Sequence, residues 1–150
     1  MTKVFRFAPV VILLLYIALK VAPHIHRVFP PALNNPDVPS PEVQRMLGDV
    51  RATISEHPDA AKQFRDMYKG MSVVVGSDEV VLRTTDDVRR AHENAGALAI
   101  QAGKIPRIPG YAEAVNEYLI QRIGTDNLPL DRGKREQIAG AFKELAWAME

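Results

Sequence analysis

The chain has 150 residues, of which 47% are hydrophobic and 25% are charged, the balance of a folded globular protein rather than of a disordered one. It contains no cysteine, which excludes disulfide bonds, cysteine-ligated zinc sites and thiol catalysis. Residues 1–41 have a net charge of +3 and residues 42–150 a net charge of −2. The larger part of the chain therefore lacks the basic excess that binding to nucleic acid requires.

An unbroken apolar run, FAPVVILLLYIAL, covers residues 7–19 and has no polar face. With its apolar neighbours it extends over residues 4–22, about 28 Å of helix, which is enough to span a thin bilayer. Arg6 and Lys20 can extend their charges to the two membrane interfaces. The sequence therefore predicts a transmembrane signal-anchor in residues 1–22. The apolar side chains of this anchor are Phe7, Val10, Leu13, Leu14, Leu15, Ile17 and Leu19.

The main alternative is a cleaved signal peptide, because Lys3 and Arg6 form a suitable basic start. The small residues of a cleavage site are missing near Ala22, which argues against cleavage. A buried helix of a soluble protein is the third alternative. Basic groups are slightly more numerous before the run than after it, which favours a cytoplasmic N-terminus and an extracytoplasmic C-terminal domain.

Residues 23–41 contain six prolines, which exclude a helix interior and a central strand. We expect an extended stalk of at most about 60 Å. His24 and His26 lie in this segment, but two histidines are too few for a metal site, and we interpret them as polar residues of the membrane interface.

Residues 42–150 carry apolar side chains at a spacing of three to four residues in five successive segments, a pattern typical of amphipathic helices. The sequence therefore predicts an all-α fold, in which the anchor and the stalk precede a compact bundle of about five helices. The predicted bounds are Ser40-Pro41 to about Glu56, Pro58 to Gly76, Thr84 to Gly103, Gly110 or Tyr111 to Gly124, and Asp131 to Met149. The predicted core includes Phe64, Leu98, Leu119, Phe142 and Leu145.

The segment 71–83 has two interpretations. Gly70 could end the second helix, and the valine-rich residues 72–75 and 80–83 could then form a hairpin. The helical spacing continues through Gly70, however, and an isolated hairpin is only marginally stable, so we favour the helix.

A short motif recurs in the third and fifth predicted helices. Ala95-Gly96-Ala97 matches Ala139-Gly140-Ala141, forty-four residues further on. Small residues allow two helices to approach closely, which would offset the unfavourable helix propensity of glycine. We therefore expect these two helices to cross at Gly96 and Gly140.

The loop KIPRIPGY presents apolar residues on a turn that two prolines make rigid. Exposed residues on such a loop are typical of protein contacts. The predicted contact residues are Ile105, Arg107, Ile108 and Tyr111. In the alternative interpretation the same side chains close one end of the bundle.

No catalytic, cofactor-binding or metal-binding site is predicted. The motifs of serine hydrolases, zinc proteases and phosphate-binding loops are absent from the sequence. His92 and Glu93 are adjacent on a predicted helix and would point about 100° apart, so they cannot share one substrate or metal. His57 lies at a helix junction, where interactions with the backbone explain it. The sequence favours a binding protein over an enzyme.

The leading hypothesis is a single-pass, membrane-tethered interaction or scaffold module, whose partners are the bilayer and a protein. One alternative is an envelope enzyme that binds a small ligand or a metal, which depends on His24, His26, His57 and His92. Another is a structural subunit of a membrane-associated assembly. The sequence leaves the oligomeric state open.

Overall fold

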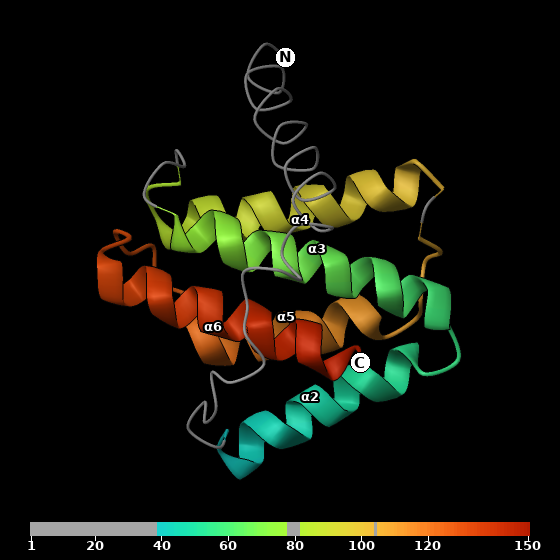
Figure 1. The fold of residues 1–150 in the computed structure, drawn as a ribbon. Helices are drawn as coiled ribbons and strands as arrows, with labels where there is room; N and C mark the ends of the chain where they lie inside the picture. Colours follow the sequence, from blue (N-terminus) through green and yellow to red (C-terminus); the bar gives the residue numbers. More distant parts are fainter. Residues whose placement is uncertain (1–38, 78–81, 104) are drawn as a thin grey trace, which may run out of the picture.

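The computed structural model describes residues 39–77, 82–103 and 105–150. The predicted anchor and nearly all of the predicted stalk, with His24 and His26, lie outside these ranges. Over the described ranges the chain forms five α-helices and no strand, which confirms the all-α bundle (Figure 1). The helices are α2 (Pro41–Ile54), α3 (Pro58–Gly76), α4 (Thr85–Gln101), α5 (Tyr111–Ile123) and α6 (Arg132–Ala148).

Three of the helices begin at the capping residues that the sequence predicted. The Ser40 side chain accepts a hydrogen bond from the backbone N–H of Val43, and that of Asp131 accepts one from Lys134. At the start of α4, Thr84 and Asp87 form a reciprocal capping box. Each cap satisfies backbone donors that have no partner within the helix.

α3 continues to Gly76, so the helical interpretation of residues 72–75 is confirmed. The Arg135 side chain of α6 donates hydrogen bonds to the carbonyl oxygens of Val75 (3.3 Å) and Leu82 (2.7 Å). These bonds connect α6 to the end of α3 and to the segment that precedes α4. One arginine thus satisfies carbonyls at a helix end, where the backbone lacks partners.

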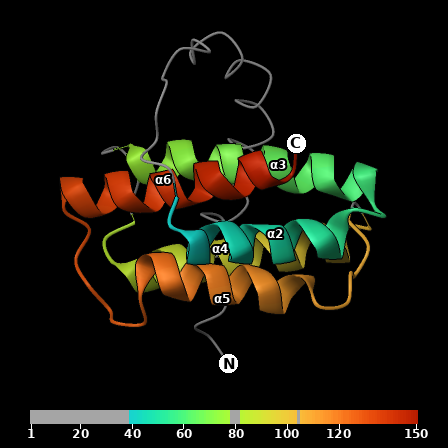
Figure 2. The ribbon, with the colours of Figure 1, turned by 90° about the horizontal axis from the view of Figure 1, so that it is seen from below.

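The helices form two layers, with α3 and α6 in one layer and α2, α4 and α5 in the other (Figure 2). α3 and α6 lie side by side and make the most extensive helix pair in the fold. Tyr68 of α3 and Phe142 and Leu145 of α6 are completely buried between the layers. Of the five predicted core residues four are buried, whereas Leu98 on α4 is half-buried and lies outside the core.

The predicted crossing of α4 and α6 at the two glycines is wrong. A methyl group built on Gly96 or on Gly140 would meet no atom within 4 Å among the described residues. α4 packs mainly on α3, and its His92 ring also contacts Phe142 of α6. The small side chains beside Gly96 therefore border open space.

Candidate functional site: an apolar cavity beside α4

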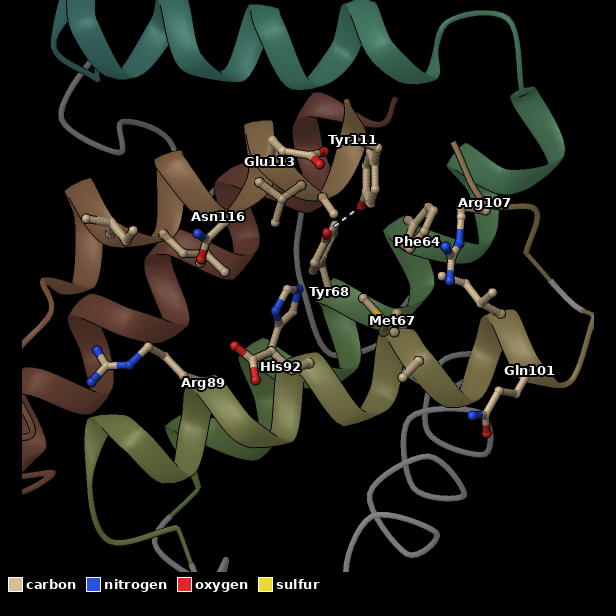
Figure 3. A pocket seen from close by; sticks show the side chains of 18 residues that line it. Phe64, Met67, Tyr68, Arg89, His92, Gln101, Arg107, Tyr111, Glu113 and Asn116 are labelled. Carbon is tan, nitrogen blue, oxygen red and sulfur yellow. Dashed lines mark hydrogen bonds between the residues drawn. The ribbon is translucent and has the colours of Figure 1, made fainter. Parts of the chain in front are cut away.

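A cavity of about 590 Å³ separates α4 from α5, with α3 as its third wall (Figure 3). We call it the α4–α5 cavity. Its volume falls within the range of about 300–1,000 Å³ that is usual for small-molecule sites. Most of the lining is apolar or aromatic: Phe64, Met67 and Tyr68 of α3, Gly96, Ala97 and Ile100 of α4, and Tyr111, Ala112, Val115, Leu119 and Ile120 of α5. The polar and charged lining residues are Arg89, His92, Glu93, Gln101, Arg107, Glu113 and Asn116.

The cavity exists because α4 presents small residues toward it. Gly96 and Ala97 occupy the middle of the wall that α4 contributes, one turn beyond His92. Neither residue has a side chain long enough to reach α5. The small-residue motif, from which a close helix crossing was predicted, thus leaves a space instead, because no described helix packs closely against Gly96.

Aromatic rings form the inner wall of the cavity. The ring centroids of Phe64 and Tyr111 lie 4.2 Å apart, and those of Phe64 and Tyr68 lie 6.3 Å apart. The hydroxyl groups of Tyr68 and Tyr111 form a hydrogen bond with each other, which joins α3 to the start of α5 (Figure 3). Burial raises the pKa of both hydroxyls, so both are neutral at physiological pH.

His92 extends from α4 toward Tyr68 (Figure 3). Its ring centroid lies 5.8 Å from that of Tyr68 and 5.8 Å from that of Phe142, so two rings hold the imidazole in place. Burial lowers the pKa of His92 from 6.5 to about 4, and the ring is therefore neutral at pH 7. Its nitrogens make no hydrogen bond to any residue that the structure describes. A neutral imidazole offers one donor and one acceptor.

Charged side chains line the rim rather than the interior of the cavity. Arg107, Glu93 and Glu113 are exposed. Arg89 pairs with Asp86 on its own helix and donates a hydrogen bond of 2.8 Å to the carbonyl oxygen of Gly124. The rim thus carries two basic and two acidic groups, and it has no net charge that would select a charged ligand.

The structure separates the four predicted contact residues of the 105–111 loop into two kinds. Ile105, Ile108 and Tyr111 are buried, as in the interpretation in which they close one end of the bundle. Arg107 is exposed and, like Tyr111, lines the α4–α5 cavity. Contact between this loop and a partner protein stays a prediction. Such a partner would meet the exposed side chain of Arg107 before the three buried side chains.

The other histidine considered in the sequence, His57, is exposed at the N-cap of α3, and within the described part of the chain its side chain makes no capping bond. No group of three or more histidine, aspartate or glutamate side chains in these ranges could hold a metal ion. None of the helices that the structure describes is long and apolar enough to cross a membrane.

Nothing in the sequence pattern predicts that Phe64, Tyr68 and His92 share one site. Phe64 is predicted from the apolar stripe of its own helix, and His92 is considered with its chain neighbour Glu93, whereas the site combines three helices. A detectable signal was present in α4, where His92 and Gly96 are four residues apart and so lie on one face. The imidazole of His92 and the gap left by Gly96, which has no side chain, lie on the same helix face, and this pattern is consistent with the wall of a cavity.

No protein-family model, curated protein or solved structure matches this chain. The α4–α5 cavity and its lining are therefore the evidence on which a function can be argued.

Proposed function

We propose that the protein is a single-pass, membrane-tethered helical module whose C-terminal domain binds a small apolar molecule in the α4–α5 cavity. The observation that carries this proposal is the aromatic-lined space beside α4, with a volume of about 590 Å³. Apolar lining with a few convergent polar groups is typical of ligand sites. The Tyr68–Tyr111 pair and His92 are such groups.

The proposed tether rests on the apolar run of residues 7–19 and on the proline-rich segment after it. A stalk of at most about 60 Å would hold the domain close to a bilayer. Molecules that partition into lipid would then be concentrated near the cavity. The proposed orientation places the domain on the extracytoplasmic side.

A second candidate function is the binding of a partner protein through the mouth of the same cavity. Ile100 of α4 and Ile120 of α5 both line the cavity, and they are 36% and 43% exposed. Apolar residues on two neighbouring helices can receive the apolar face of an amphipathic helix. This arrangement favours the interaction module over a structural subunit.

The α4–α5 cavity can be blocked by one substitution. Gly96→Leu would place a side chain in the space beside α4, where a methyl group meets no described atom within 4 Å. Gly140→Leu on α6 is the matched control, because Gly140 is also helical and half-buried and has the same open space, but it does not line the cavity.

The assay is photoaffinity labelling of the full chain in lipid nanodiscs with a diazirine derivative of decanol, followed by peptide mapping. We expect labelling of cavity residues in the wild type and in Gly140→Leu, and a loss of at least tenfold in Gly96→Leu. Equal labelling of all three proteins would contradict the proposed site. Recovery of the intact full chain in the soluble fraction of a lysate would contradict the tether.

A further inference from the structure

We infer that the α4–α5 cavity selects an uncharged apolar molecule with one hydrogen-bonding group, an alcohol, a phenol or a carbonyl compound, and that His92 binds this group. The inference rests on the proposed function and specifies the ligand class of the same cavity. It follows from the positions of charged and neutral polar groups, which differ between the interior and the rim.

The polar groups in the aromatic part of the cavity are all neutral. They are the hydroxyls of Tyr68 and Tyr111 and the imidazole of His92, whereas the other neutral polar side chains of the lining, the amides of Gln101 and Asn116, are exposed. In the described residues that line the cavity, the charged side chains of Glu93, Arg107 and Glu113 are exposed at the rim, and the half-buried Arg89 is paired with Asp86. A carboxylate or an ammonium group placed among the rings would lose its hydration without gaining an opposite charge. The interior therefore excludes the charged end of a fatty acid or an amine.

The neutral polar groups are not equivalent. The two tyrosine hydroxyls already bind each other, so their mutual hydrogen bond would have to be shared or broken. His92 has no hydrogen-bond partner among the described residues, and the rings of Tyr68 and Phe142 fix its position. A ligand group that binds His92 would meet an oriented donor and acceptor, which lowers the entropic cost of binding.

A molecule without a polar group would leave the imidazole without a partner in a partly desolvated site. Such unsatisfied groups are the usual basis on which proteins distinguish a hydroxyl compound from its hydrocarbon analogue. We therefore expect decanol to bind more tightly than decane, by about five- to tenfold. Decanoate should bind at least tenfold more weakly than decanol, because its carboxylate has no counter-charge beside the rings.

The test is competition against the diazirine derivative of decanol, with the full chain in nanodiscs and with decanol, decane and decanoate as competitors. In the wild type, decanol should displace the probe at the lowest concentration. His92→Phe keeps a ring between Tyr68 and Phe142 and removes the hydrogen-bonding nitrogens. It should abolish the preference for decanol over decane while decane itself still competes. Thermal unfolding of each variant checks that it is folded.

His92→Gln supplies a second variant, which keeps a donor and an acceptor but lacks the ring. It should retain part of the preference for decanol. A preference that is unchanged in both variants would overturn the role of His92. If decanoate competes as well as decanol, and Arg107→Gln abolishes this, the ligand is an anionic amphiphile that the rim recognises, and the inference is wrong. Absence of any cavity labelling in the wild type would overturn the proposed function and the inference together.

Discussion

The two sides of α3 are packed very differently. On one side α3 meets α6, whose large side chains Ile138, Phe142 and Leu145 are completely buried. On the other side α4 contributes Gly96 and Ala97, and a cavity remains (Figure 3). Both helices that flank α3 are amphipathic and both carry an Ala-Gly-Ala motif. The difference shows that an apolar stripe becomes a core only where the facing residues are large enough to fill the space.

This contrast predicts that substitutions of equal kind will have unequal effects on the two sides. Side chains between α3 and α6 should contribute strongly to the free energy of unfolding, because close packing adds dispersion contacts to the transfer of apolar surface from water. Substitutions that face the cavity should change ligand binding more than stability.

The largest effect is expected for Phe142→Ala. Phe142 is completely buried in α6 and contacts the rings of Tyr68 and His92. Truncation should lower the free energy of unfolding by about 3–5 kcal/mol, through lost burial and the resulting cavity. Urea denaturation of the full chain in nanodiscs, followed by the fluorescence of Trp147, would measure it. An unchanged midpoint would show that the α3–α6 side is no better packed than the α4 side.

A smaller effect is expected from acid, and it should depend on His92. The pKa of this residue is about 4 in the folded protein and 6.5 in an unfolded chain, so the unfolded state binds more protons between these values. Stability should therefore be complete above pH 6.5 and should fall as the pH decreases toward 4, by no more than about 3 kcal/mol, since part of the ring is accessible to water.

His92→Phe should remove this component of the acid sensitivity, because phenylalanine does not titrate. The rings of Tyr68 and Phe142 surround the imidazole, while Arg89 and Glu93 are the charged neighbours on α4. Since both variants share these neighbours, the difference between their denaturation curves at each pH isolates His92. Parallel curves for the wild type and His92→Phe from pH 7 to pH 4 would show that the imidazole does not stay neutral.

Helix positions could be predicted from this sequence because their signals are local. Ser40, Asp131 and the Thr84–Asp87 box act within three residues of chain, and each marks the start of an observed helix. Gly124 has a positive φ of 84° directly after α5, a conformation that glycine adopts easily. The stripes of α3 and α6 likewise identified Phe64, Phe142 and Leu145 as core residues.

The site could not be predicted in the same way, because it depends on which helices face each other. Tyr68 and Tyr111 are forty-three residues apart and meet only through the packing of α3 against the start of α5. The small residues around Gly96 form a close helix crossing if another helix covers them, and they form the wall of a cavity if none does. Periodicity locates a face of a helix, but it does not identify what lies opposite that face.

The smallest predicted effect concerns the two glycines and tests the contrast most directly. Gly96 and Gly140 both lie inside helices, and a β-carbon at either position meets no described atom within 4 Å. Alanine should therefore stabilise the protein at each site by about 0.5–1 kcal/mol, because it restricts the unfolded chain and introduces no clash. Thermal unfolding of Gly96→Ala and Gly140→Ala would measure both.

A stabilisation at Gly140 with a loss of stability at Gly96 would mean that α4 closes onto α5 in solution, and the cavity would then be smaller than the structure shows. Stabilisation at both sites, with decanol labelling kept in Gly140→Ala and weakened in Gly96→Ala, would identify the open space beside Gly96 as the part of the bundle that accepts a ligand.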